Sequence, residues 1–285
     1  MILNNIKPKI VIHGGYGSFE GMNDTRKAVH ESLTKIVNKA YAVLLQKNAK
    51  TAVVEAVKLM EDDPLYNAGT GSRIQADGKI RMSASFMHGN ALRFSGIINI
   101  QNIQNPIEVA QNLQNEHYPI IACNHSNYGQ DIWNLPHYNP ETEHRRKEYE
   151  SRRKGKTGTV GAVAIDINGN IVAGTSTGGI GNETPGRVGD SPTVAGNYAS
   201  KNAGVSVTGI GEEIVNLSVA SRIVSLVDEE INLNDAVQSV MARAKENKYN
   251  FGIISLDRFG NCIVEKTTEE IYYASSDGQA QTFYH

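Results

Sequence analysis

The sequence has only two cysteines, Cys123 and Cys262, and they lie far apart in its 285 residues. A disulfide framework needs several cysteines, and the short spacing of a C-x-x-C zinc motif is absent. We therefore expect two buried, reduced thiols. The eight histidines form no H-x-x-x-H pair, so their spacing gives no support to a catalytic zinc site.

Long hydrophobic runs are also missing, since nowhere do about 18 apolar residues follow one another. Near the start of the chain, Lys7, Pro8 and Lys9 stand where a signal peptide would need apolar residues. A net charge of −2 gives no electrostatic reason to expect nucleic acid or an anionic membrane as the partner. We therefore expect a soluble, cytoplasmic protein that acts on a small molecule or a peptide.

Apolar residues recur with helical or strand-like spacing along most of the chain. Helices are expected over residues 24–44, 51–60, 212–227 and 234–246. Strands are expected over residues 9–12, 80–86, 97–100, 159–165, 171–175, 251–256 and 262–266, and around Val205 and Val207. Asn168 and Gly169 predict a tight hairpin turn that joins two of these strands in antiparallel fashion. The pattern predicts a mixed α+β layered domain.

Charged residues crowd the segment from about residue 135 to residue 157, where almost nothing is apolar. Such a segment cannot bury enough surface to offset the entropy lost when it is ordered. We therefore predict an exposed, mobile linker. A charged, solvated helix in the middle of the segment is the alternative.

Two short patterns point to other kinds of site and fail. Gly174–Gly178 matches the G-x-S-x-G elbow with Ser176 as nucleophile, but glycines and prolines follow it instead of a helix, and the only later histidine is His285. Gly155–Thr157 is similar to the end of a phosphate-binding loop, but Glu150 stands where that loop needs glycine. The paired glycines elsewhere lack the third glycine of a dinucleotide fingerprint, so no organic cofactor is implied.

Thr159 begins an apolar strand directly after the charged segment, which alone means little because threonine commonly begins strands. Around it, however, six motifs resemble, in order, those of the plant-type L-asparaginase / isoaspartyl peptidase (β-aspartyl peptidase) family of N-terminal-nucleophile (Ntn) hydrolases. They are His13–Gly15, Asn67–Gly71, Thr157–Val163, Thr175–Gly179, Pro185–Pro192 and Thr208–Glu212.

The resemblance implies an α+β fold of the Ntn-hydrolase type, a four-layer αββα sandwich. It implies a chain that cuts itself between Gly158 and Thr159, so that residues 1–158 form an α subunit and residues 159–285 a β subunit of one folded domain. A homodimer of such α–β units is also implied.

The cleavage would create the base that Thr159 needs as a nucleophile. In the intact chain its nitrogen is an amide without useful basicity. Once freed, it becomes an α-amine with a pKa of about 8, roughly 2.5 units below that of lysine, and could activate the Thr159 hydroxyl. Gly158 suits the scissile position because it has no side chain and tolerates strained backbone geometry.

The resemblance assigns further roles in amide hydrolysis. Thr177 would be a second hydroxyl hydrogen-bonded to the nucleophile, and Asn67 would lie near it. Thr208 and Gly209 would form the oxyanion hole, in which one donor typically contributes about 3 kcal/mol. The alternative for Thr177 is an ordinary threonine at the end of a strand. The alternative for Thr208 and Gly209 is a simple strand-to-helix turn.

Arg187, Asp190 and Gly211 would bind the substrate. Arg187 and Asp190 lie three positions apart in a loop rich in glycine and proline, where they would hold the α-carboxylate and α-ammonium of a zwitterion. The side-chain amide of the substrate would then face Thr159. The alternative is a surface ion pair.

The same resemblance implies a structural sodium ion bound by backbone carbonyls of the loop from residue 60 to residue 70. Its ligands would be the carbonyls of Met60, Glu61, Asp63, Tyr66, Ala68 and Thr70. Carbonyl ligation leaves no side-chain signature, so the residues themselves do not reveal this metal.

The chain departs from the family pattern at two positions where the charge changes. Ser83 stands where the family usually has aspartate, and Glu183 stands where it has lysine. The ending Thr267–Glu270 also differs. The expected activity is hydrolysis of β-aspartyl amides, either isoaspartyl dipeptides or L-asparagine, with release of L-aspartate. A glycosylasparaginase-like amidase and a degenerate homologue that never matures and has a binding role are the alternatives.

Overall fold

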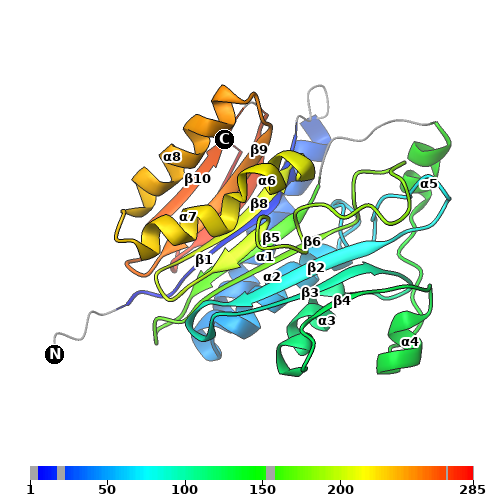
Figure 1. The fold of residues 1–285 in the computed structure, drawn as a ribbon, viewed down its shortest axis with the longest axis horizontal. Coiled ribbons are helices and arrows are strands. Elements are labelled where there is room, and N and C mark those ends of the chain that lie inside the picture. The colour runs from blue at the N-terminus through cyan, green and yellow to red at the C-terminus, as the bar shows by residue number, and fades with distance from the viewer. Residues whose placement is uncertain (1–5, 18–22, 152–157, 268, 285) are drawn as a thin grey trace.

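The computed structural model describes residues 6–17, 23–151, 158–267 and 269–284. Within them the strands form two sheets (Figure 1). In spatial order, the larger sheet contains β12 (Ala280–Tyr284), β11 (Ile271–Ser276), β1 (Lys9–Tyr16), β5 (Val160–Ile165), β6 (Ile171–Thr177), β2 (Met82–His88), β3 (Arg93–Ile100) and β4 (Ile120–Ala122). The smaller sheet contains β10 (Cys262–Lys266), β9 (Phe251–Asp257), β8 (Ala203–Gly209) and β7 (Asn197–Ala199).

The helices fall into groups according to what they cover. Those on the larger sheet are α1 (Asn23–Gln46), α2 (Ala49–Asp62) and α3 (Pro106–Asn112). Those on the smaller sheet are α7 (Val219–Asp228) and α8 (Leu233–Glu246). The others are α4 (Tyr128–Trp133), α5 (Glu143–Glu150), α6 (Gly211–Leu217) and the 3-10 turns η1 (Gly89–Ala91) and η2 (Leu113–Asn115).

Alternating side chains of the central strands are buried on both faces of the larger sheet. On β1, Ile10 and Ile12 face helices α1 and α2, while Val11 faces the smaller sheet. On β5, Ala164 likewise faces the helices and Val163 faces the smaller sheet. Residues of both sheets, including Ile254 on β9, make up the core between them. The near-continuous apolar sequence of these strands follows from this double burial.

The predicted strands and all but one of the predicted helices are present, with shifts at their ends. The expected hairpin is an antiparallel pair of β5 and β6, and Gly169 adopts a φ of 77° in its turn. The helix expected over residues 212–227 is instead two helices, α6 and α7, because Ser218 adopts a left-handed φ of 51° between them. Strands β4, β7, β11 and β12 were not expected; β11 pairs with β1.

The charged segment predicted as a mobile linker contains a helix, α5, which is the alternative that its sequence left open. This helix is not simply solvated, because Arg145 is buried. Its N-cap Thr142 accepts a hydrogen bond from the Arg145 backbone, which satisfies a free N–H at the start of the helix. Residues 152–157 of the segment lie outside the described residues.

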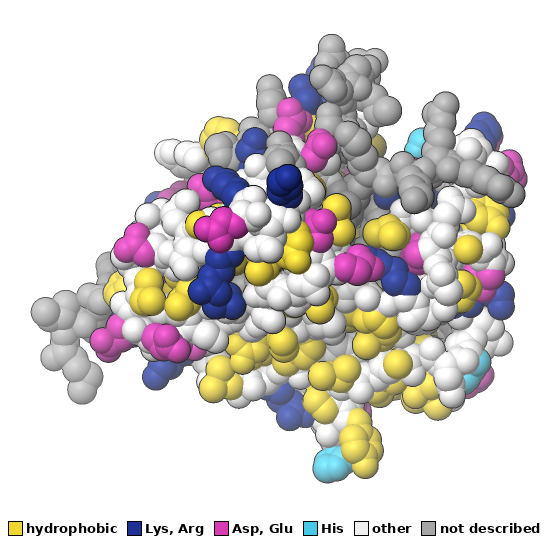
Figure 2. Space-filling view, turned by 45° about the horizontal axis from the view of Figure 1, so that its top comes forward, with side chains coloured by type: hydrophobic (Ala, Val, Ile, Leu, Met, Phe, Trp, Pro, Cys, Tyr) yellow, Lys and Arg dark blue, Asp and Glu magenta, His cyan; other side chains and the backbone are white. Residues whose placement is uncertain are grey.

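Acidic and basic side chains are interspersed over the face of the molecule seen in Figure 2, in keeping with the small net charge. In the part of the chain that the structure describes, no helix has the length and apolarity that crossing a bilayer requires. The fold is a mixed α and β architecture.

Candidate active site

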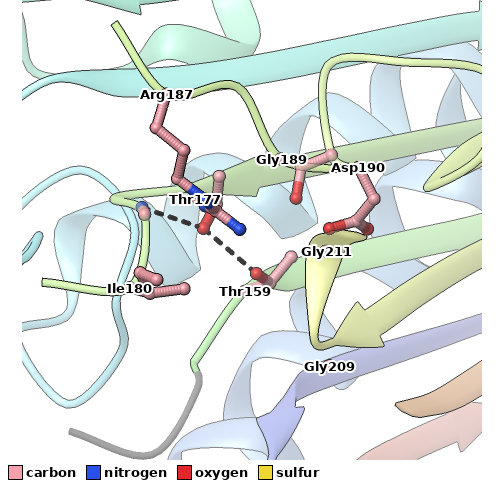
Figure 3. A pocket seen from close by; sticks show the side chains of 10 residues that line it. Thr159, Thr177, Ile180, Arg187, Gly189, Asp190, Gly209 and Gly211 are labelled. Carbon is pink, nitrogen blue, oxygen red and sulfur yellow. Dashed lines mark hydrogen bonds between the residues drawn. The ribbon is translucent and has the colours of Figure 1, made fainter. Parts of the chain in front are cut away.

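Thr159 and Thr177 lie side by side at the same end of the larger sheet. Thr159 immediately precedes β5, and Thr177 ends the neighbouring antiparallel strand β6. The Thr159 hydroxyl donates a hydrogen bond of 3.0 Å to Oγ1 of Thr177, and Gly179 N–H donates to the same oxygen at 3.2 Å (Figure 3). The candidate nucleophile is thus buried and held by the hydroxyl that the sequence predicted beside it.

The Gly158 carbonyl, at the predicted cleavage bond, accepts a hydrogen bond of 3.1 Å from Asn67 N–H. There is no room here for side chains. A Cβ on Gly158 would lie 2.8 Å from Cβ of Asn67, and one on Gly15 would lie 2.8 Å from Cα of Gly158. Gly15 also adopts a φ of 122°, which favours glycine. These contacts explain why the His13–Gly15 motif and the cleavage segment both need glycine.

The Asn67 side chain holds two loops together. Its Nδ2 donates to the Gly179 carbonyl at 2.6 Å, and its Oδ1 accepts from Arg73 N–H at 2.9 Å. The sequence placed Asn67 near the nucleophile, and the structure does bring it there. Its contact with the Gly158 carbonyl runs through its backbone rather than its side chain.

A pocket opens beside Thr159, between strand ends and loops (Figure 3). Its lining residues are Thr159, Thr177, Gly179, Ile180, Arg187, Gly189, Asp190, Ser191, Gly209 and Gly211. Thr208, one position before Gly209, is fully buried, and among the described residues its hydroxyl has no hydrogen-bond partner. A buried polar atom without a partner is unusual and is expected where a ligand completes the site.

Arg187 and Asp190 both line the pocket and both approach Gly211 closely. A Cβ on Gly211 would lie 2.9 Å from Nη2 of Arg187 and 3.0 Å from Oδ1 of Asp190. The two side chains are not a surface ion pair, since Asp190 is only 4% exposed. Burial raises the pKa of Asp190 to about 7, against the opposing effect of the Arg187 charge.

The ion-pair partner of Arg187 is Glu212, which the sequence analysis gave no role. Nε and Nη2 of Arg187 donate to the two carboxylate oxygens of Glu212 at 2.8 and 2.9 Å. This bidentate geometry fixes the plane of the guanidinium group. Glu212 directly follows Gly211 at the end of the Thr208–Glu212 motif. Its place in that motif was the one feature of the sequence that could have indicated a role in the site.

His13 was also missed as a member of the site. It is fully buried, and burial lowers its pKa to about 3, although a hydrogen bond with the Thr159 backbone acts in the opposite direction. Its Nε2 lies 2.9 Å from the Ser206 hydroxyl, which lies 2.7 Å from the Thr175 hydroxyl. At neutral pH, His13 is therefore an uncharged hydrogen-bonding group behind the nucleophile.

The two departures from the family pattern lie near this site. The Ser83 hydroxyl accepts a hydrogen bond from Asn99 N–H at 3.1 Å. Glu183 is buried, its Oε1 accepts from Gln75 at 3.2 Å, and a Cβ on Gly179 would overlap that oxygen. The Glu183 carboxylate thus lies directly behind a residue that lines the pocket.

Ser176, the nucleophile of the rejected elbow pattern, is fully buried on β6 and does not line the pocket beside Thr159. Side chains alternate along a strand, so Ser176 and Thr177 point to opposite faces of the sheet. The structure gives the elbow interpretation no support.

The predicted sodium loop closes on itself through a hydrogen bond of 2.7 Å from Thr70 N–H to the Glu61 carbonyl. Gly69 and Gly71 have positive φ, and a Cβ on Gly69 would overlap the Glu61 carbonyl oxygen. A Cβ on Gly71 would lie 3.0 Å from the carbonyl oxygen of Tyr66. Carbonyl oxygens thus gather around the two glycines, which fits a hard cation that prefers oxygen ligands.

A side-chain metal site has no such support. Within the described ranges, no group of three or more His, Cys, Asp or Glu side chains could hold a metal ion. Both cysteines are free and partly buried, and burial raises the pKa of the Cys262 thiol to about 11.

Comparison with known proteins gives a consistent result. A sequence model of the family described as asparaginase matches residues 6–157 and 130–284. An isoaspartyl peptidase/L-asparaginase from Nostoc is 41% identical over 97% of this chain and 94% of its own length. A plant-type L-asparaginase from Pyrococcus furiosus is 36% identical over 93% and 95% of the two chains. An isoaspartyl peptidase/L-asparaginase from Bos taurus is 33% identical over 96% and 95%.

Proposed function

The chain belongs to the asparaginase family, and from this premise we propose that it is a self-cleaving threonine hydrolase of β-aspartyl amides. Its substrates are isoaspartyl dipeptides and L-asparagine, and its common product is L-aspartate. The observation that supports the proposal most directly is the 3.0 Å hydrogen bond between the Thr159 and Thr177 hydroxyls at the wall of a pocket that also contains Arg187 and Asp190.

Maturation begins in the intact chain. The Thr159 hydroxyl attacks the Gly158 carbonyl, the peptide bond rearranges to an ester, and water hydrolyses the ester to a Gly158 carboxylate and a free Thr159 amine. Asn67 N–H, 3.1 Å from the carbonyl oxygen, stabilises the negative charge that develops on it. The products are the α segment, residues 1–158, and the β segment, residues 159–285.

The mature enzyme uses Thr159 as both nucleophile and base. Its α-amine, with a pKa of about 8, takes the proton as the hydroxyl attacks the substrate amide. The amine or ammonia leaves with a proton, and water then hydrolyses the β-aspartyl ester on Thr159. Thr177 holds the attacking oxygen in place through the hydrogen bond described above.

The other predicted residues bind the substrate and its developing charge. Thr208 and Gly209 supply the oxyanion hole: the Thr208 hydroxyl is buried without a partner among the described residues, and Gly209 lines the pocket. Arg187 binds the α-carboxylate and Asp190 the α-ammonium of the substrate, with Gly211 leaving room between them. Glu212 holds the Arg187 guanidinium in the plane needed for this contact.

Several further features belong to the same proposal. The two sheets and their covering helices form a four-layer αββα sandwich of the Ntn-hydrolase type. The backbone carbonyls of the loop from Met60 to Thr70 would hold a sodium ion, which would supply a fixed positive charge to stabilise this loop; no organic cofactor takes part. The protein acts in the cytoplasm as a homodimer of α–β units, without nucleic acid or membrane as a partner.

The test is release of L-aspartate from L-asparagine and from an isoaspartyl dipeptide by the purified protein. The expected result is turnover of at least one of them, with loss of activity in Thr159→Ala. Turnover by Thr159→Ala at the wild-type rate would rule out this function for Thr159. The ratio of kcat/KM for the two substrates then gives the substrate preference.

A further inference from the structure

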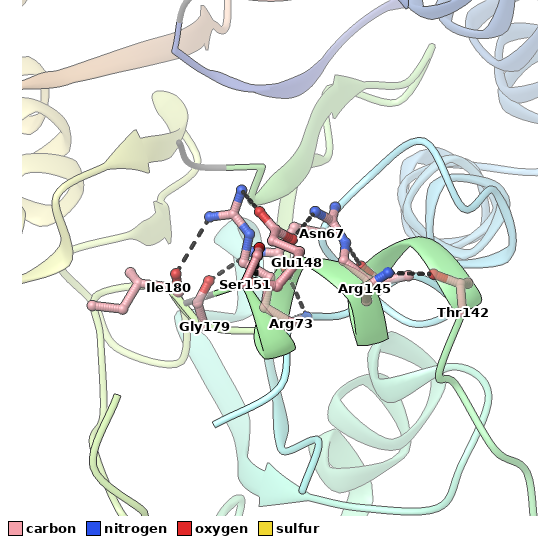
Figure 4. Close-up of polar contacts among 9 residues, drawn as sticks. Asn67, Arg73, Thr142, Arg145, Glu148, Ser151, Gly179 and Ile180 are labelled. Atoms are coloured by element: carbon pink, nitrogen blue, oxygen red, sulfur yellow. Dashed lines mark hydrogen bonds and ion pairs between the residues drawn. The ribbon is translucent and has the colours of Figure 1, made fainter. Parts of the chain in front are cut away.

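The helix of the charged segment, α5, lies against a loop that supports the pocket wall (Figure 4). We propose that α5 positions the active site: Glu148, held by Arg145, orients Arg73, and Arg73 in turn supports the pocket wall at Gly179 and Ile180. The inference rests on the proposed function. After cleavage, α5 near the end of the α segment would then still support the active site, and would not serve only as a linker to the cleavage site.

Three charged side chains form the link between α5 and the loop. The Glu148 carboxylate lies between two guanidinium groups, 2.7 Å from Nη1 of Arg145 and 3.6 Å from Nη2 of Arg73 (Figure 4). The side chains of Arg73, Arg145 and Glu148 are only 7%, 9% and 16% exposed. Because removal of one member of a buried ion pair leaves an uncompensated charge, this cluster holds its geometry more strongly than a surface pair would.

Helix α5 and the residues before it are bonded to the same loop at several points. Arg145 Nε donates to the Gly71 carbonyl at 2.6 Å, and Gly71 N–H donates to the Pro140 carbonyl at 2.9 Å. Farther along, the Tyr149 hydroxyl donates to the Ala76 carbonyl at 3.3 Å. The segment from residue 71 to residue 76 is therefore fixed to α5 at both of its ends.

The loop transmits this fixation to the catalytic threonines. Arg73 Nη1 donates to the Ile180 carbonyl at 3.4 Å, and Arg73 N–H donates to Asn67, whose Nδ2 holds the Gly179 carbonyl. Gly179 N–H in turn donates to the Thr177 hydroxyl, the partner of Thr159. Gly179 and Ile180 are neighbours in the chain, so a displaced Arg73 guanidinium shifts the Ile180 carbonyl and, through the backbone, the Gly179 N–H that holds the Thr177 hydroxyl.

This path predicts a specific kinetic signature. Arg187 and Asp190, which bind the charged groups of the substrate, lie on a different loop and are not part of it. Loss of the Glu148 charge should therefore impair alignment of the attacking hydroxyl more than binding. We expect kcat to fall by about tenfold in Glu148→Gln, with KM changed by less than about threefold.

The matched control is Glu143→Gln on the same helix. The Glu143 side chain is 81% exposed and pairs at the surface with Lys147, so its removal should leave both constants within about twofold of wild type. Arg73→Lys provides a second variant: it keeps the positive charge beside Glu148 but not the planar group that reaches Ile180, and it should also lower kcat. Unchanged kcat in both Glu148→Gln and Arg73→Lys would overturn the inference.

Hydrogen exchange makes the test independent of catalysis. In a Thr159→Ala background, Glu148→Gln should speed amide exchange at residues 179–182, and Glu143→Gln should not. Equal exchange in both variants would refute the inference even if the wild-type protein proved inactive. Inactivity of the wild type toward β-aspartyl substrates would instead refute the proposed function, so the two failures are distinguishable.

Discussion

Replacement of Asp190 by asparagine should reveal a conflict between stability and substrate binding. Asp190 is buried between two glycines: a Cβ on Gly196 would lie 2.5 Å from its Oδ2, and one on Gly211 would lie 3.0 Å from its Oδ1. Oδ2 has no hydrogen-bond partner among the described residues. The pocket thus holds a buried carboxyl group with one unpartnered oxygen, as the proposed binding of the substrate ammonium by Asp190 requires.

The magnitude follows from the pKa of this carboxyl. Burial raises the pKa from 3.8 to about 7, so the folded protein binds the Asp190 proton more tightly than the unfolded chain does. The resulting stability is complete below the unfolded pKa and is lost as pH rises through the folded pKa. About three units at 1.36 kcal/mol each give a loss on the order of 4 kcal/mol, more than half of it between pH 5 and pH 8.

An asparagine side chain does not titrate. As pH rises from 5 to 8, the unfolding free energy of the parent protein should therefore fall relative to that of Asp190→Asn. Denaturant unfolding at several pH values measures this difference. Both proteins should carry Thr159→Ala, because an uncleaved single chain suits two-state treatment better than two segments do. If the difference in unfolding free energy between the two proteins stays constant over this pH range, the Asp190 carboxyl does not have a pKa raised by burial. Without Thr159→Ala, the same substitution should raise KM.

Three further substitutions test other parts of the site. Arg187→Ala should spare self-cleavage but raise KM by about 10- to 100-fold, because only the substrate presents a free α-carboxylate; equal loss of both activities would mean that Arg187 holds the fold. Thr177→Val keeps the side-chain shape but removes the hydroxyl, and kcat should fall at least about tenfold in a steady-state assay; wild-type kcat would contradict its role. Gly161→Ala places a Cβ that overlaps the Ser206 hydroxyl and lies 2.5 Å from Nε2 of His13. It should lower the unfolding free energy by about 1–3 kcal/mol in denaturant titrations, and an unchanged midpoint would count against this packing.

The regular elements were largely predictable because their local patterns agree with their packing. Strand β5 is apolar apart from one glycine, β6 begins with three apolar residues, an Asn-Gly turn joins them, and both faces of their sheet are indeed buried. Where a local conformation interrupts a pattern, prediction failed: Ser218 is an ordinary polar residue in a helical sequence, and nothing in the spacing reveals its left-handed φ. Strand β11, near the C-terminus, was missed, and its pairing with β1 joins residues far apart in the sequence, which local patterns do not reveal.

The site divides in the same way. The positions of Thr159, Thr177 and Arg187 follow from motifs, since strand pairing and a short loop bring them together. The identity of the Arg187 partner does not follow, because the sequence offers both Asp190 and Glu212 as carboxylate partners. Only the folded chain brings both carboxylate oxygens of Glu212 within hydrogen-bond distance of Arg187.

Helix α5 shows a different limit of sequence-based prediction. Composition indicated solvation of the charged segment, but Arg145 and Glu148 are largely buried as an ion pair, and Glu148 also pairs with Arg73 from outside the segment; composition does not record that arrangement.

The intact mass of the purified protein after incubation shows whether Thr159 becomes an N-terminal nucleophile. We expect two species, residues 1–158 and residues 159–285, with Thr159 at the new N-terminus, and a single uncut species for Thr159→Ala. A wild-type protein that hydrolyses β-aspartyl amides while its mass remains that of the uncut chain would contradict the account, because the amine proposed as the base would not exist.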